Sequence, residues 1–228
     1  MGKRQLSIVV GIIVVVGALG ITIGRYTAPN TTSTTSLVTT TTSPSTQPQT
    51  AIWPFASSRT RFTTPVSAAR SFAVAYLGFT NPLVGSFQAG DNQSGEVSVR
   101  ATASGPVTTI MVRKLTSAQN WWVLGAATHD AQLSKPATLE KISSPVILTG
   151  MSTAFEAVVN VAIREDGVLT PLCSDVVMGG SMGTMSEFSK SLSFIKPSTT
   201  AGAIVFRILS AKDGSVVAAA AQRIGFKP

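Results

Sequence analysis

The spacing of apolar and polar positions sets the first 24 residues apart from the rest of the chain. Residues 6–24 contain no charge and show no polar face at helical spacing. A helix of this length spans roughly 30 Å, which matches the hydrocarbon core of a bilayer. Lys3 and Arg4 precede the stretch, and only Arg25 follows before a long uncharged segment. The pattern predicts a single-pass anchor in the lipid bilayer, with residues 1–5 cytoplasmic and everything beyond residue 25 extracytoplasmic.

A cleaved secretory signal is the alternative for the same stretch. Lys3 and Arg4 would form its basic start, and Ala18-Leu19-Gly20 offers small residues at a cleavage site. Apolar residues continue through Ile21 and Ile23, beyond the usual length of a signal's apolar region. That length favours the anchor over the signal.

The next stretch lacks a regular apolar pattern. Residues 26–50 consist mainly of Thr, Ser, Pro and Gln and carry no charge. Such a segment buries too little apolar surface to offset the entropy of ordering it. We therefore expect a disordered, Thr-rich stalk over residues 25–61.

Helical periodicity appears at residues 62–134 and then changes to strand periodicity. Thr64 and Pro65 are typical of the first turn of a helix, and Gly78 of its end. Apolar residues recur between them at spacings of three and four. Alternating or continuous apolar runs follow at 95–102, 108–115 and 121–124. The pattern predicts a small α+β domain, one helix followed by three antiparallel strands.

Two adjacent tryptophans occupy the last of these strands. Neighbouring side chains of a strand point to opposite faces of the sheet. We therefore expect one of Trp121 and Trp122 to pack beneath the helix, and the other to be exposed or to cover a small groove.

The remaining residues, 137–228, show short β-type runs at the spacing of a β-sandwich. Asp166-Gly167 and Asp213-Gly214 are strong hairpin signals because glycine accepts a positive φ. The runs lie at residues 138–142, 146–149, 157–164, 169–177, 188–194, 203–209 and 215–224. The whole chain is thus expected to be mainly β.

Several motifs in this last region occur in the order of a known family. They are Ile142-Ser-Ser-Pro-Val146, Thr149-Gly150, Ala154-Phe155-Glu156, the strand to Arg164, Glu187-Phe188-Ser189 and residues 210–215. Together, over about residues 137–226, they resemble the bacterial spore-germination immunoglobulin-like domain, Gmad2. The resemblance implies an immunoglobulin-like sandwich of extracytoplasmic bacterial proteins, often membrane-anchored. It implies a role in recognition or assembly, and it supplies no catalytic residues.

Charge and composition exclude several classes of function. The formal charge is +8, yet only 12% of residues are charged and the cations are scattered. Nucleic-acid surfaces cluster cations on one face, so we expect no nucleic-acid partner. The chain has one histidine, His129, and one cysteine, Cys173. These provide neither an intrachain disulfide nor a metal-ligand set, so we expect no metal site and no cofactor.

Residues 179–183 match the G-x-S-x-G pattern of serine hydrolases, with Ser181 as nucleophile. That site requires a strand, a following helix and a later histidine, whereas His129 precedes the motif. We therefore interpret the segment as a flexible interstrand loop. We expect His129, beside Asp130, to be a solvated residue at the end of a strand. We expect Cys173 to be a small buried apolar residue. The sequence predicts no catalytic residues and no enzyme.

The combined reading is a membrane-anchored recognition or scaffold protein of the bacterial cell envelope. Its β domains would bind another envelope protein or a cell-wall polymer. The candidate binding anchors are Trp121, Trp122 and Phe155, although Phe155 could instead plug the end of the sandwich. Two alternatives remain open: a small-ligand carrier that uses residues 62–134, and a serine hydrolase at Ser181.

Overall fold

The computed structural model describes residues 47–115 and 117–228, which belong to one compact unit. The predicted anchor at 6–24 and most of the predicted stalk lie outside these residues. Within the described part of the chain, no helix has the length and apolar character needed to cross a membrane.

A single helical segment forms where the periodicity places it. The α-helix α1 (Pro65–Ser71) continues as the π-helical turn η1 (Phe72–Leu77). The Thr64 side chain accepts a hydrogen bond from the Ser67 amide, and Pro65 occupies the first turn. Gly78 ends the helix with φ of 93°, a conformation that glycine adopts at little cost. The predicted helix, its start and its end are therefore confirmed.

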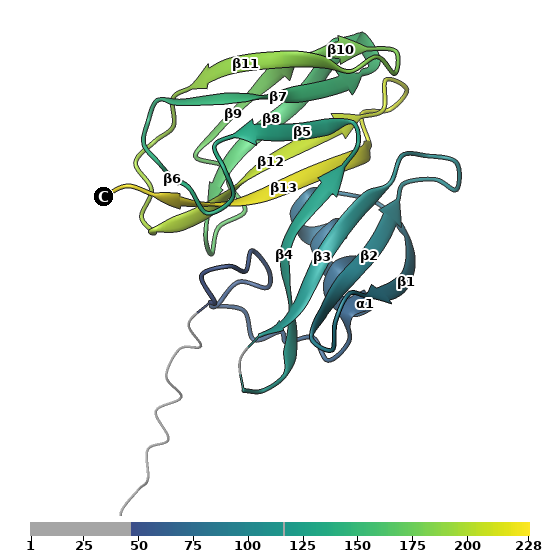
Figure 1. The fold of residues 1–228 in the computed structure, drawn as a ribbon, viewed down its shortest axis with the longest axis vertical. Coiled ribbons are helices and arrows are strands. Elements are labelled where there is room, and N and C mark those ends of the chain that lie inside the picture. The colour runs from purple at the N-terminus through teal and green to yellow at the C-terminus, as the bar shows by residue number, and fades with distance from the viewer. Residues whose placement is uncertain (1–46, 116) are drawn as a thin grey trace, which may run out of the picture. The chain divides into compact units, whose positions relative to one another are not determined.

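The helix covers one face of a four-stranded antiparallel sheet (Figure 1). The strands are β1 (Leu83–Ala89), β2 (Ser94–Arg100), β3 (Thr108–Leu115) and β4 (Asn120–Thr128). The last three match the expected strands, whereas the sequence did not indicate β1. This strand lies at the sheet edge, and a bulge between Val84 and Phe87 breaks its pairing with β2. Its apolar and polar residues therefore do not alternate.

The folded part begins earlier than the predicted end of the stalk at residue 61. Ile52 and Phe55 are buried in the hydrophobic cluster beneath the helix. The Ile52 amide donates to the Val123 carbonyl at 2.8 Å, and the Trp121 amide donates to the Phe62 carbonyl at 2.9 Å. Residues 51–62 thus pack along β4, which corrects the predicted boundary. The segment is too short and irregular to show a period, so its burial depends on contacts with β4.

The remaining strands form two packed layers (Figure 1). One layer has the order β13-β12-β8-β9, and the other consists of β5, β7 and β11. The strands are β5 (Ala131–Lys135), β6 (Lys141–Ile142), β7 (Val146–Ala154), β8 (Val158–Glu165), β9 (Cys173–Met178), β10 (Gly180–Ser181), β11 (Ser186–Leu192), β12 (Ala201–Leu209) and β13 (Val216–Phe226). The expected mainly β architecture is confirmed.

Strand β5 connects the two parts of the structure. All but its last residue lie within residues 62–134, which the sequence assigned to the first domain, yet it pairs with β7 of the sandwich. Its only pairing with β4 is Thr128 with Ala131, across the turn that joins the two strands. The sandwich therefore begins near residue 130.

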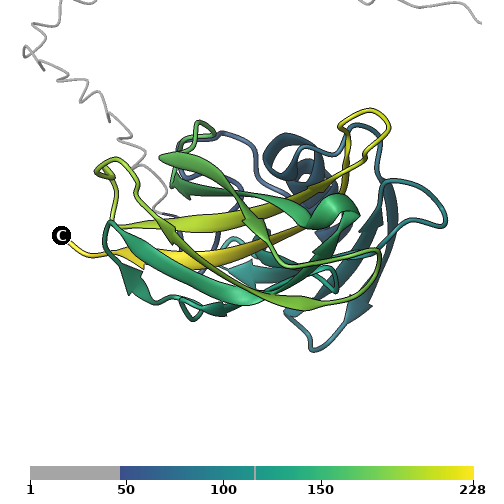
Figure 2. The ribbon, with the colours of Figure 1, turned by 90° about the horizontal axis from the view of Figure 1, so that it is seen from above.

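Strands β12 and β13 contribute to both hydrophobic clusters. Ala203 and Val205 of β12 belong to the cluster beneath the helix, whereas Ile204 and Phe206 belong to the cluster inside the sandwich. One sheet runs from β1 to β9 through the pairing of β4 with β13, at Ala126 and Ala221. In Figure 2 these two strands, drawn in yellow, lie between the helix and the layer that contains β7.

Candidate functional site

Residues 179–183, which match G-x-S-x-G and were expected to form an interstrand loop, are part strand and part turn. Gly180 and Ser181 form β10, which pairs in parallel with Thr153 and Ala154 at the end of β7. A Cβ on Gly180 would lie 1.8 Å from the Thr184 carbonyl oxygen, so only glycine fits this close approach. Backbone pairing holds the segment in place, which the glycine-rich composition did not reveal.

His129 and Asp130 lie on the other side of β7 from Ser181. The Thr153 amide donates to the Asp130 carbonyl at 2.9 Å, while β10 lines the opposite edge of the same strand end. Two strand spacings put their backbones about 10 Å apart. In the residues that the structure describes, no hydrogen bond joins Ser181 to a histidine or a carboxylate. His129 is exposed, and its Nδ1 lies 3.3 Å from Asp130 Oδ1.

The cysteine and the acidic residues form no further reactive group. Cys173 is half-buried at the start of β9, and burial raises the pKa of its thiol. This reduces its thiolate fraction at neutral pH. Across residues 47–115 and 117–228, no three His, Cys, Asp or Glu residues converge in a way that could hold a metal ion.

Both tryptophans are buried, with 6% of Trp121 and 1% of Trp122 exposed. Trp121 packs edge-on against Phe87 with centroids 5.1 Å apart, and it belongs to the cluster beneath the helix. Trp122 faces away, where the Arg61 guanidinium covers it at 5.3 Å from the ring centroid. Of the two expectations for the second indole, exposure is wrong, because Arg61 of the folded segment 51–62 covers Trp122.

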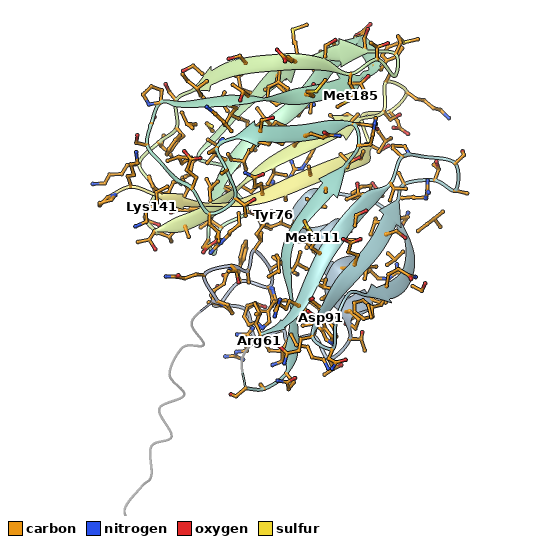
Figure 3. The ribbon with its side chains drawn as sticks, viewed as in Figure 1. Arg61, Tyr76, Asp91, Met111, Lys141 and Met185 are labelled. Carbon is orange, nitrogen blue, oxygen red and sulfur yellow. The ribbon has the colours of Figure 1, made fainter. Side chains whose placement is uncertain are left out.

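Phe155 is exposed, and two methionines accompany it. Phe155 is 55% exposed, Met178 is 63% exposed and Met182 is 79% exposed. Strand pairing brings them to one end of the sandwich: Met178 pairs with Val158, and Ser181 pairs with Ala154. The 3-10 turn η2 (Phe155–Ala157) also contacts β10 directly. We refer to Phe155, Met178 and Met182 as the apolar tip. Figure 3 labels Met185 in the same loop region.

The backbone of the apolar tip is strained. Glu156, Ala157 and Met182 have φ values of 56°, 64° and 53°. Each side chain in this left-handed region costs roughly 1–2 kcal/mol. Strained residues of this kind concentrate at functional sites, where surrounding structure holds them. Here the pairing of β10 with β7 provides that support.

A cavity of about 430 Å³ lies where β4, β5 and β13 meet. Its lining is mainly apolar and includes Met111, Leu124, Leu133 and Phe206. The buried Thr128 hydroxyl also lines it and has no hydrogen-bond partner in the described residues. Leu124 alternates with the helix-facing Val123, so this cavity lies on the face of β4 that points away from the helix. Figure 3 labels Met111 at its position on β3.

Sequence reasoning missed the methionines of the apolar tip and two arginines, the buried Arg164 and the partly buried Arg207. Arg207 left a signal because it interrupts the apolar run of β12, whereas Arg164 stands at the end of the apolar run of β8. The methionines left little signal, since their proximity to Phe155 depends on the parallel pairing of β10 with β7.

Comparisons with known proteins bear on the sandwich alone. No curated protein and no solved structure matches the chain. A family model, the immunoglobulin-like domain of bacterial spore germination, matches residues 130–215. The match starts just before β5, in agreement with the start of the sandwich seen in the structure, and it ends just before β13, the last strand of the sandwich. The resemblance inferred from the sequence motifs is thereby confirmed, and this part of the chain is similar to the Gmad2 family.

Proposed function

We propose that this protein is a membrane-anchored recognition protein of the bacterial cell envelope, and that its apolar tip binds another envelope protein. The proposal rests chiefly on one observation: three large apolar side chains are exposed together on a strained but well-supported backbone. The similarity of residues 130–215 to the Gmad2 domain supports an extracytoplasmic setting. The uncharged stretch at 6–24 supports an anchor.

The chemistry of the apolar tip favours a protein over a wall polymer as the partner. Phenylalanine and methionine gain binding energy from burial against other apolar groups, and methionine adapts its shape to the surface it meets. A polysaccharide presents mainly hydroxyl and charged groups, which need polar partners. Glu156 is the only charged residue in the turn η2, and it is itself acidic. Binding, not catalysis, is the role that this surface fits.

Site-specific crosslinking in the full-length protein tests the proposal. A photoreactive residue at position 155 or 182 should crosslink to one envelope protein. The control is position 168, since Val168 is also an exposed apolar residue but lies beyond the opposite end of β8. Crosslinks of equal yield from all three positions would contradict a specific surface, and crosslinks to wall polymer would replace the protein partner.

A substitution at Phe155 measures how much this side chain contributes to the binding free energy. Phe155→Ala should weaken binding of the crosslinked partner by ~1–4 kcal/mol, the range for an aromatic residue at the centre of an interface. Ser181→Ala tests the hydrolase alternative in the same assay. Loss of function in a folded Ser181→Ala variant, with partner binding retained, would favour the hydrolase.

The topology needs its own experiment. Protein extracted from membranes should retain an N-terminus before residue 6, with the region after residue 25 accessible only from outside the cytoplasm. A soluble product that starts near Ile21 would identify 6–24 as a cleaved signal and would remove the anchor from the proposal.

The cavity between β4, β5 and β13 supports a second candidate, a small-ligand carrier. Its volume and apolar lining suit a small apolar molecule held by few polar contacts. Leu133→Trp should fill the cavity and abolish uptake of a fluorescent apolar probe, while leaving the apolar tip free to bind. Equal probe uptake by the wild type and by Leu133→Trp would exclude this cavity as the binding site.

A further inference from the structure

Two arginines hold the end of the helix from the strands beneath it. Arg164 of β8 and Arg207 of β12 lie on the face that also carries Ala203 and Val205. Both donate to the carbonyl oxygen of Tyr76, at 2.8 Å and 3.1 Å. Tyr76 precedes the last residue of η1, where helix carbonyls carry partial negative charge. Figure 3 labels Tyr76 at the level where the two parts of the structure meet.

These two cations lack a carboxylate partner. Asp166 is bound through both its oxygens by Arg223, the third arginine near this face. In the described part of the chain, neither Arg164 nor Arg207 forms a salt bridge. Only 7% of Arg164 is exposed. Burial, and then repulsion from Arg164, lowers the pKa of Arg207.

The Tyr76 carbonyl and the Tyr76 ring, whose centroid lies 5.0 Å from the Arg164 guanidinium, do not balance this charge. A helix end supplies the equivalent of about half an elementary charge, whereas the two guanidinium groups carry two. A buried cation without a partner is costly, and a buried N–H group is rarely left unpaired. Yet the Nε atoms of both Arg164 and Arg207 are buried without a hydrogen-bond partner among the described residues.

A pocket of about 290 Å³ lies against the same two side chains. Arg164, Arg207, Tyr76 and Asn160 line it, and the exposed residues Ala75 and Gly78 lie at its rim. A Cβ on Gly78 would be 4.0 Å from Arg207 Nε, so the absence of a side chain there leaves room beside the guanidinium group. The pocket therefore combines access, positive charge and unused hydrogen-bond donors.

We propose that this pocket binds a small, doubly charged oxyanion of the phosphate class. Two guanidinium groups match its two negative charges, and their planar forks suit phosphate oxygens. A carboxylate would neutralise only one of the two. Because the same arginines hold Tyr76, a bound anion would also strengthen the attachment of the helix to β8 and β12. This site does not depend on the apolar tip or on its partner.

Thermal unfolding of the full-length protein in detergent tests the assignment. Inorganic phosphate should raise the unfolding temperature above that in sodium chloride of equal ionic strength, because a ligand that binds only the folded state stabilises it. Acetate at the same ionic strength should give a much smaller rise. No phosphate-specific rise, or an equal rise with acetate, would overturn the proposal.

Variants locate the effect. Arg207→Gln should weaken phosphate affinity about tenfold or more, the loss expected for a hydrogen bond to a charged group. Arg207→Lys, which keeps the charge but loses the fork, should lie between this variant and the wild type. Arg70→Gln removes an exposed arginine from α1 and should bind phosphate as the wild type does. If Arg207→Gln responds to phosphate as fully as the wild type, the pocket is not the site.

A second ligand identifies the source of the phosphate group. Glycerol 3-phosphate carries the same dianionic group on an organic carrier. A rise equal to that with inorganic phosphate would show that the pocket accepts a terminal phosphate of a larger molecule. A rise with inorganic phosphate alone would restrict the site to the free ion, and both results support the oxyanion assignment.

Discussion

The helix-covered sheet and the sandwich bury their strands differently. Strands β2 and β3 are buried on the helix side and remain partly exposed on the other, as the burial of Val97, Val99, Ile110 and Val112 shows. Strands β12 and β13 are covered on both sides, by the helix cluster and by the sandwich cluster. The two regions therefore depend on each other in different ways. Strands β12 and β13 of the sandwich complete the cluster beneath the helix, and the helix-covered region shields one face of these strands from water.

This asymmetry bears on the expected boundary between two domains. A sequence boundary near residue 134 separates β4 from β13, although Ala126 and Ala221 pair across it. It also separates the helix from Ala203 and Val205, against whose cluster it packs. The difference between strands buried on one face and strands buried on both faces can be tested by removing or altering each region in turn.

Removing the helix-covered region should have the largest effect. The fragment 137–228 is expected from its sequence to fold alone as an all-β domain. The shared core predicts instead that the free energy of unfolding of this fragment is lower by about 5 kcal/mol or more, because the apolar face of β12 and β13 would be exposed to water. A loss of that size approaches the whole stability of many domains.

Urea unfolding followed by circular dichroism measures this loss, with the fragments 130–228 and 47–228 as comparisons. The fragment 130–228 restores β5 and should be the more stable of the two shorter fragments. A fragment 137–228 as stable as 47–228 would establish independent domains and would contradict a core shared by the two regions.

Phe206→Ala should have the next largest effect. Phe206 is buried in the sandwich cluster, where its ring lies 5.9 Å from that of Phe188. Removing a buried phenylalanine side chain costs about 3–5 kcal/mol. The matched control is Phe155→Ala, because Phe155 is exposed and its loss should change stability by less than about 0.5 kcal/mol. Chemical denaturation of both variants checks the prediction, and comparable losses would mean that Phe155 plugs the sandwich end.

Thr64→Ala should have the smallest effect. The Thr64 hydroxyl accepts a hydrogen bond from the Ser67 amide at 3.2 Å, so one amide in the first turn of α1 gains a partner that the helix itself does not supply. Loss of such a cap costs about 1 kcal/mol. Thr64→Ser, which retains the hydroxyl, is the control and should remain close to the wild type. If both variants unfold at the same denaturant concentration as the wild type, this cap does not stabilise the helix.

Local signals in the sequence predicted much of the fold. The helix begins at Pro65 and ends at Gly78 because backbone geometry and capping act within a few residues. Apart from β5 and β10, which no run indicated, the strands of the sandwich overlap the apolar runs, and the Asp213-Gly214 turn joins β12 to β13. Edge strand β1 escaped prediction because its bulge removes the alternation.

The candidate sites were less predictable, because each combines residues distant in the chain. Phe155 was identified from sequence, but Met178 and Met182 join it only through the pairing of β10 with β7. The tryptophans were identified too, but their exposure depended on the segment 51–62, which had been assigned to the stalk. An aromatic side chain is a candidate anchor in any sequence, and only its neighbours decide whether it reaches solvent.

By itself the sequence determined the mainly β class, the helix with its caps, the resemblance of the last region to Gmad2 and the expectation of an anchor at 6–24. These properties follow from local periodicity, turn chemistry and motif order, which nearby residues specify. Only the tertiary structure decided that β12 and β13 contribute to two cores, that Trp121 and Trp122 are buried and that Arg164 and Arg207 meet at Tyr76. Those outcomes depend on strand pairing over long sequence separations, where burial and charge balance are properties of the packed molecule and not of any one segment.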